Sequence, residues 1–214
     1  RRRTREIGFK LRHMIDKIPT QREGGFSDNV SKIELETVAE AILHFEAVKK
    51  RFLDINSWEL LAGKGFGEFS LCDKNGNLFF DLPQVHCYIR IKVPTLPNLS
   101  EDQYDWVQIE KFETEKTETS ESIYIRARPA ESPQNNHPTT SHFFKDKATC
   151  NFIINRTSKI VTVEIHGRNE KSNIEDVTVF EKVRNAIVST GAKIIGSNIQ
   201  WKSLIEGLIK KDEK

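Results

Sequence analysis

The stretch that decides the fold is residues 175–210, EDVTVFEKVRNAIVSTGAKIIGSNIQWKSLIEGLIK. It contains no proline, and its apolar residues recur at steps of three, four or seven. These residues are Phe180, Val183, Ile187, Ile194, Trp201, Ile205 and Leu208. The spacing predicts an apolar stripe along one long helix, or along two helices that meet near Gly191 or Gly196.

The first part of the chain changes from a strand pattern to a helix pattern. Residues 31–39 alternate between apolar and polar side chains, which predicts a half-buried strand. Residues 40–53 instead carry apolar side chains at helical spacing. A second, short helix is expected around Trp58, with Asn56 or Ser57 as its cap.

A series of strands is expected in the middle of the chain, separated by turns and loops. Asn75-Gly76 is a strong signal for a tight hairpin turn. The proline-containing stretches 94–103 and 129–141 are expected to be loops. The predicted strands occupy residues 66–72, 77–82, 85–93, 104–114, 123–127, 143–154 and 159–166.

This order of elements resembles the helix-grip fold of the START-like superfamily, and the resemblance covers roughly residues 31–210. It depends on an apolar helix that leads to a tryptophan, on a strand with an Asn-Gly turn, and on a final strand pair that leads into the closing helix. The stretches are Ala47-Val48 through Asp54, Ile55 and Trp58, then Phe66–Asp73 with Asn75-Gly76, and Ala148–Ile154 with Val161–Gly167.

The resemblance implies an α+β fold of the helix-grip type. A curved antiparallel sheet of about six or seven strands would wrap around a long C-terminal helix, with two short helices after the first strand. We expect a single domain of this kind over residues 31–214. The superfamily includes lipid-transfer domains, plant pollen-allergen proteins, polyketide cyclases and many uncharacterised bacterial proteins, so a cavity is expected between the sheet and the last helix.

The leading hypothesis for function is therefore noncatalytic binding of an apolar or amphipathic, lipid-like small molecule in this cavity. Ligand cavities are mostly apolar with a few placed polar groups. No cofactor is expected. The candidate ligand-binding residues are Tyr88, Trp106, Phe152, Gly191 and Trp201.

The alternative within the superfamily is an enzyme of the cyclase or hydrolase type. His166 ends a predicted strand, and Glu164 lies two residues earlier on the same face, where it could orient the imidazole. This pair would act as acid and base if it pointed into a cavity open to solvent. A histidine at the end of a strand is also common without any catalytic role.

The N-terminal residues 1–30 depart from the core of the superfamily. Residues 1–19 are basic, and their apolar residues fall on one helical face before Pro19 and Gly24-Gly25 end the pattern. This face consists of Ile7, Leu11, Met14 and Ile18. A basic helical extension is expected, and it either packs on the domain or serves as an adaptor that binds a partner or a membrane surface.

Composition excludes several classes of protein. With 214 residues, 37% apolar residues and a net charge of +2, the chain has enough material for a core and no overall basic surface for nucleic acid. Three unclustered cysteines favour a reduced, cytoplasmic setting and give no metal-binding spacing. The sequence leaves the ligand and the oligomeric state open.

Overall fold

The described residues form seven strands and three α-helices in an α+β arrangement. The computed structural model describes residues 16–63, 67–92, 104–134, 144–171 and 198–212. In chain order the elements are β1 (Gly25–Glu34), α2 (Val38–Leu53), the 3-10 turn η1 (Ile55–Ser57), α3 (Trp58–Ala62), β2 (Glu68–Cys72), β3 (Tyr88–Lys92), β4 (Asp105–Lys116), β5 (Ser120–Pro129), β6 (Thr149–Thr157), β7 (Ile160–Glu170) and α5 (Asn198–Ile209).

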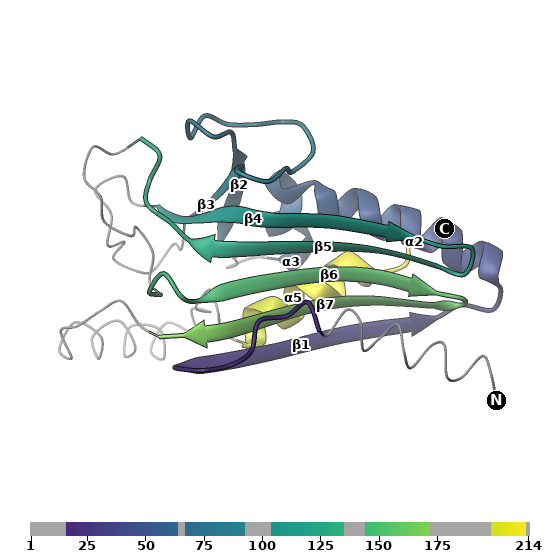
Figure 1. The fold of residues 1–214 in the computed structure, drawn as a ribbon. Coiled ribbons are helices and arrows are strands. Elements are labelled where there is room, and N and C mark those ends of the chain that lie inside the picture. Colours follow the sequence, from purple (N-terminus) through teal and green to yellow (C-terminus); the bar gives the residue numbers. More distant parts are fainter. Residues whose placement is uncertain (1–15, 64–66, 93–103, 135–143, 172–197, 213–214) are drawn as a thin grey trace.

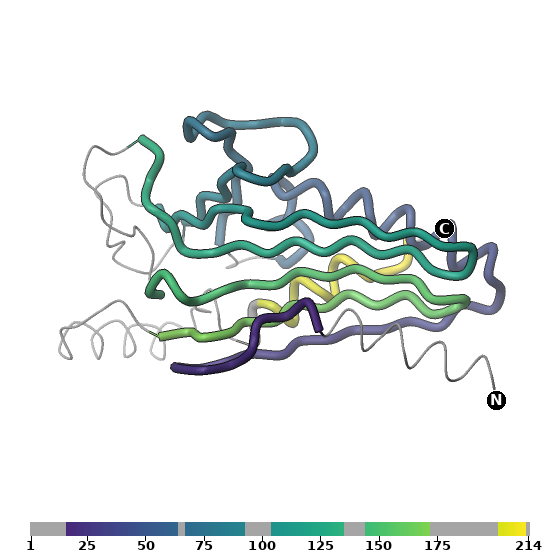
Figure 2. Tube along the Cα trace, viewed as in Figure 1, coloured from purple at the N-terminus to yellow at the C-terminus, as the bar shows by residue number. Residues whose placement is uncertain are grey.

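The seven strands form one antiparallel sheet in the order β1-β7-β6-β5-β4-β3-β2. The long hairpins β4–β5 and β6–β7 make its centre, as Figure 2 shows. β1, the first strand of the chain, pairs with β7, the last one, and β2 forms the opposite edge. This topology is consistent with the helix-grip fold expected from the sequence.

The helices α2 and α5 lie against one face of the sheet, which we call the inner face (Figure 1). Alternate strand residues point to this face, as the pleat requires. In β7, for example, Val161, Val163 and Ile165 join the hydrophobic core with the helices. The residues between them, such as Thr162 and Glu164, point to the outer face.

Helix α2 begins at a capping box and buries one stripe. The Thr37 hydroxyl accepts a hydrogen bond from the Glu40 backbone N–H, and the Glu40 carboxylate accepts one from the Thr37 N–H. These bonds satisfy N–H groups that a helix start leaves without partners. The buried stripe, at spacings of four, three and four, consists of Ala41, Phe45, Val48 and Phe52.

Helix α5 carries the C-terminal part of the apolar stripe predicted from the sequence. Trp201, Leu204, Ile205 and Leu208 are buried, at the spacing of one helical face. The structure does not show a long C-terminal helix, because α5 spans 12 residues. The predicted positions from Phe180 to Ile194, including Gly191, lie outside the described residues. None of the helices in the described residues combines the length and apolarity needed to cross a membrane.

Several predicted strands differ from the observed ones in their bounds; β6, for example, begins at Thr149 and not at residue 143. β1 begins at Gly25, before the predicted start at residue 31. The apolar alternation that predicts a strand is missing from its first residues, because the inward positions there carry the polar side chains of Ser27 and Asn29. Residues 25–30 are therefore part of the sheet. The expected strand over residues 77–82 is wrong: after the Asn75-Gly76 turn, only a single bridge between Cys72 and Leu78 forms.

The side chain of Asn56 explains why the return strand stops. Its Oδ1 accepts the Leu71 N–H at 2.8 Å, and its Nδ2 donates to the Phe79 carbonyl at 3.1 Å. In an antiparallel pair, these two backbone groups would bond to each other. Asn56 bridges them instead, while the Phe79 N–H still donates to the Leu71 carbonyl at 2.9 Å, so only one of the two bonds of such a pair forms.

Candidate functional site

An apolar cavity lies between the inner face of the sheet and α5. The indole of Trp201 in α5 contacts the Phe152 ring edge-on, with 5.6 Å between ring centroids, and lies 6.3 Å from the Phe69 ring. Such a lining suits an apolar ligand. The main wall residues are Phe69, Ile89, Ile91, Val107, Phe152 and Trp201.

The cavity is narrow. Its volume is about 40 Å³. One water molecule needs roughly 10–15 Å³ on this scale, so the cavity has room for a few waters. A ligand with more than a few heavy atoms therefore requires side chains of the wall to move aside.

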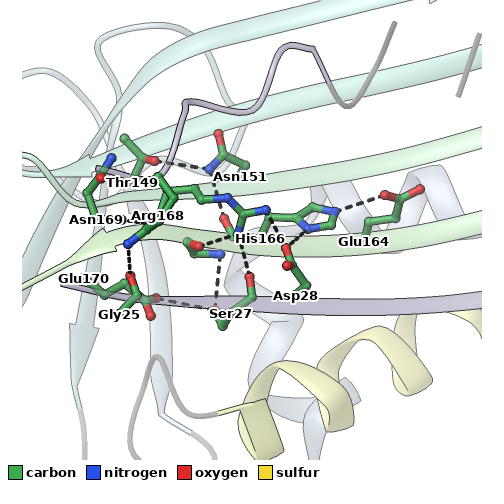
Figure 3. Close-up of polar contacts among 12 residues, drawn as sticks. Gly25, Ser27, Asp28, Thr149, Asn151, Glu164, His166, Arg168, Asn169 and Glu170 are labelled. Atoms are coloured by element: carbon green, nitrogen blue, oxygen red, sulfur yellow. Dashed lines mark hydrogen bonds and ion pairs between the residues drawn. The ribbon is translucent and has the colours of Figure 1, made fainter. Parts of the chain in front are cut away.

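A carboxyl group interrupts the apolar lining at the end of β7. Glu170 lines the cavity together with Cys150 and Thr149. The Ser27 hydroxyl of β1 lies 3.4 Å from Glu170 Oε1 and donates to it. Figure 3 shows Glu170 beside Ser27, at the place where β7 meets β1.

A β-bulge brings this carboxyl to the cavity. Ser27 pairs with Gly167 and Gly25 pairs with Glu170, so β7 carries one more residue than β1 at this point. Asn169 has φ 57°, a left-handed conformation that asparagine tolerates better than most residues. With strict alternation Glu170 would share the outer face with Arg168, and the extra residue turns it inward.

Gly167 provides the space that the Glu170 side chain occupies. A Cβ at this position would overlap Glu170 Oε1 and would lie 2.5 Å from the Ser27 hydroxyl. Because glycine has no Cβ, the carboxyl can fold back along the inner face of β7. The backbone conformation of Gly167-Arg168-Asn169-Glu170 thus determines where the carboxyl lies.

Burial perturbs both ionisable groups at this end of the cavity. Loss of solvent is the main cause that raises the pKa of Glu170 to about 7, and the neighbouring Asp28 raises it further against the opposing effects of Ser27 and Arg168. Burial, reinforced by the nearby Glu170, holds the pKa of the Cys150 thiol well above its usual value. The thiol therefore stays protonated and unreactive at neutral pH.

The N-terminal residues 16–23, which we call the strap, cross the outer face of the sheet opposite the helices (Figure 1). They hold the bulge through Asn169. Its Oδ1 accepts the backbone N–H groups of Arg22 at 2.7 Å and Glu23 at 3.2 Å, and its own N–H donates to Gln21 Oε1 at 2.9 Å. The strap thus fixes the residue that turns Glu170 inward.

The first residues of the strap are also bound to the sheet. Lys17 Nζ lies 2.7 Å from Glu113 and 2.5 Å from Glu115, and its carbonyl accepts the Tyr124 hydroxyl at 3.0 Å. Ile18 packs on Tyr124. Residues 16–18 of the predicted basic helix form a turn and a bend instead of a helix, with Lys17 and Ile18 packed on the domain, while residues 1–15 lie outside the described part.

The sequence-predicted pair His166 and Glu164 comes together on the outer face. His166 Nε2 lies 3.0 Å from Glu164 Oε2, and Nδ1 lies 2.5 Å from Asp28 Oδ1 (Figure 3). Burial of the imidazole opposes its charge, but the two carboxylates outweigh burial and raise the pKa of His166. Burial opposes ionisation of Asp28 as well, but the hydrogen bonds and charges of His166 and Arg168 outweigh burial and lower the pKa of this carboxyl.

This geometry does not favour catalysis by His166. Both ring nitrogens are held by carboxylates, and neither His166 nor Glu164 lines the apolar cavity. The pair meets one condition for an acid and base, a mutual hydrogen bond, but it points to the face opposite the cavity. Within the described residues, no group of three or more His, Cys, Asp or Glu side chains is arranged to hold a metal ion.

The predicted ligand-binding residues separate into two groups. Phe152 and Trp201 line the cavity, and Gly191 lies outside the described residues. Tyr88 and Trp106 do not line it, because their neighbours Ile89 and Val107 occupy the inward positions of β3 and β4. The two aromatic rings instead contact each other on the outer face, with centroids 6.0 Å apart.

Sequence reasoning missed Glu170. The predicted strand ended at residue 166, and simple alternation would have placed residue 170 on the outer face in any case. The signal that was present is Gly167 followed by Asn169, two residues that together permit a bulge.

Comparison with known proteins gives distant structural similarity alone. No protein-family model matches the sequence, and no curated protein matches it. A hypothetical protein from Helicobacter pylori aligns at a TM-score of 0.47 with 10% identity, covering 90% of this chain and 96% of that one. Major latex-like protein 151 from Panax ginseng aligns at 0.31 with 9% identity, covering 80% and 100%.

Truncated norcoclaurine synthase from Thalictrum flavum aligns at a TM-score of 0.34 with 7% identity, covering 91% of this chain and 100% of that one. The latex-like protein and the synthase are helix-grip proteins. With TM-scores below 0.5, these similarities establish neither a family nor a function for this chain.

Proposed function

We propose that this protein binds an apolar or amphipathic small molecule, without catalysis, in the cavity between the sheet and α5. The observation that carries the proposal is the lining, in which apolar side chains from five strands and one helix surround a single carboxyl group among the described residues. We further propose that the fold is of the START-like helix-grip type with a long closing helix, and that the ligand is lipid-like.

The lining of the cavity supports binding. The thiol of Cys150 is held protonated, so it does not serve as a nucleophile at neutral pH. Phe152 and Trp201 are the proposed contacts for the apolar part of the ligand. Trp201 is the wall residue that connects the sheet to α5, so its movement would widen the cavity.

Filling the cavity tests the proposal. Ala127 lines it and is buried, so Ala127→Leu places three further carbon atoms in the space a ligand needs. Isothermal titration with 1-hexanol is expected to show saturable binding to the wild type and at least tenfold weaker binding to this variant. Ala47→Leu, at a partly exposed position of α2, makes the same chemical change away from the cavity and is the control.

Two outcomes would overturn the proposal. One is an absence of saturable binding to the folded wild type, both of 1-hexanol and of its charged six-carbon analogues. The other is equal binding to the wild type and to a folded Ala127→Leu variant, which would place the alcohol elsewhere. Circular dichroism of each variant establishes that it is folded before titration.

A further inference from the structure

We propose that the ligand of this cavity is an amphipathic amine, whose ammonium group contacts the Glu170 carboxylate and whose apolar part lies against Phe152 and Trp201. This inference rests on the proposed function, and it names the chemical class of the ligand. The carboxyl group is the feature of the cavity that an apolar binding site does not need.

The backbone around Glu170 is built to bring the carboxyl inward. Asn169 adopts a left-handed conformation, Gly167 leaves the space that the side chain fills, and the strap holds Asn169 from the outer face. Left-handed conformations and β-bulges have a cost in stability. Simple continuation of β7 would avoid that cost and would turn the Asn169 amide, not a carboxyl, to the inner face, so the bulge is what brings the Glu170 carboxyl to the cavity.

The charges around Glu170 leave room for a cation on the cavity side. Arg168, the nearest guanidinium, points to the outer face and is engaged by Asp28 Oδ1 at 2.6 Å and by the Gly167 carbonyl at 2.7 Å. From β1, the Ser27 hydroxyl donates to Glu170 at the long distance of 3.4 Å. From β6, Cys150 offers a protonated thiol.

A partly buried carboxylate without a charged partner is costly, and an ammonium ion in contact with it offsets that cost. A neutral alcohol can accept or donate one hydrogen bond there but gives no charge pairing. A carboxylate ligand would repel an ionised Glu170. The three head groups therefore have a predicted order of affinity: ammonium, then hydroxyl, then carboxylate.

The first experiment compares hexylammonium, 1-hexanol and hexanoate by isothermal titration at pH 8. Hexylammonium is expected to bind the wild type about tenfold or more tightly than 1-hexanol. The reason is that its ammonium group forms a hydrogen bond between charged groups with Glu170, and the hydroxyl of 1-hexanol does not. In Glu170→Gln this preference is expected to disappear while 1-hexanol still binds. Glu206→Gln, an exposed site on α5, is the matched control and is expected to keep the preference.

The second experiment uses the wild type alone and does not depend on any variant folding. Because burial raises the pKa of Glu170 to about 7, the carboxyl is mostly protonated at pH 5.5 and mostly ionised at pH 8. The ammonium stays charged throughout, so hexylammonium affinity is expected to rise roughly 30-fold over this interval. The affinity of 1-hexanol is expected to change little.

The outcomes separate this inference from the proposed function. If none of the three probes binds, the proposed function fails and the inference fails with it. If 1-hexanol binds as tightly as hexylammonium at pH 8, and neither depends on pH, the cavity binds small molecules but the amine assignment is wrong. A preference for hexylammonium that survives in a folded Glu170→Gln variant would also overturn the assignment.

Discussion

At the scale of single residues, the carboxyl of Glu170 makes the stability of the protein depend on pH. Its pKa in the folded protein, about 7, lies above the ordinary value of 4.5, so the folded state binds a proton more tightly than the unfolded chain does. The stabilising contribution is fully present below pH 4.5 and is lost as the pH rises through 7. The protein is thus less stable at pH 8 than at pH 5 on account of this one residue.

We predict that Glu170→Gln makes the protein more stable than the wild type at pH 8 and leaves its stability nearly unchanged at pH 5. The full shift corresponds to about 3 kcal/mol, and partial exposure of the side chain reduces the expected gain to about 2 kcal/mol. Urea denaturation at the two pH values measures it. Glu206→Gln is the control, and an equal effect of both substitutions would refute the prediction.

Single residues also show what strand alternation can and cannot predict. Of the predicted ligand-binding residues, Phe152 on the inner face lines the cavity, whereas Tyr88 and Trp106 on the outer face do not reach it. The outer face of β3 and β4 is itself covered, so Trp106 is as buried as a core residue, with 0% exposure. Aromatic character therefore does not distinguish the two faces here.

At the scale of elements, two β-bulges change which residues lie on the inner face of the sheet. The bulge in β4, between Ile109 and Lys111, puts Phe112 in the inner core although it shares sequence parity with the outward Trp106. The bulge in β7 does the same for Glu170. An inserted residue shifts every later side chain to the other face, and a period-two pattern in the sequence contains no sign of where that occurs.

We predict that two substitutions at Asn169 separate the roles of its side chain and its backbone. Asn169→Gly removes the hydrogen bonds to Arg22 and Glu23 but permits a positive φ, and it is expected to cost about 1–2 kcal/mol of stability. Asn169→Ala loses the same bonds and adds the left-handed strain, about 1 kcal/mol more. Chemical denaturation of both variants measures the difference, and an alanine variant as stable as the glycine variant would contradict the left-handed bulge.

The contact between α3 and α5 gives a second prediction at this scale. A Cβ on Gly207 would overlap the Leu61 carbonyl oxygen, so the two helices approach more closely than any other residue permits. Gly207→Ala is therefore expected to destabilise the protein by about 1–3 kcal/mol. Helix propensity alone gives the opposite sign, a gain of about 1 kcal/mol, so thermal denaturation decides between the two.

The elements that the sequence did predict are those with long, regular patterns. Phe45, Val48 and Phe52 of α2 and the stripe of α5 from Trp201 to Leu208 follow helical spacing and are buried, whereas Ile42, which the same spacing predicts as buried, is exposed. The strand expected over residues 77–82 failed because the Asn56 side chain, distant in sequence, bonds the Leu71 N–H and the Phe79 carbonyl, which would otherwise bond to each other. Local propensity does not contain such a tertiary contact.

At the scale of the whole molecule, the sheet separates two environments. The inner face holds the helices and the apolar cavity, and the outer face holds the strap and the charged cluster around His166. Asn169 joins them, because it binds the strap on one side and turns Glu170 toward the cavity on the other. The strap is therefore expected to affect both stability and the cavity.

We predict that deletion of residues 1–19 is more harmful than deletion of residues 1–15, because it also removes Lys17 and Ile18. The thermal midpoint of the longer deletion is expected to lie about 5 °C below that of the shorter one. Burial raises the pKa of Tyr124 to about 12, and uncovering the ring is expected to lower that pKa toward 10. Spectrophotometric titration at 295 nm measures it, and equal values for both deletions would show that the strap does not cover Tyr124.

The central claim is that a small molecule occupies the apolar space between the sheet and α5. The most direct measurement is the set of intermolecular nuclear Overhauser effects between the alkyl protons of bound 1-hexanol and the aromatic protons of the protein. Our account predicts effects to Phe152 and Trp201, and none to Tyr88 or Trp106 on the outer face. Effects to the outer pair alone, or to none of the four rings in a saturated sample, would contradict it.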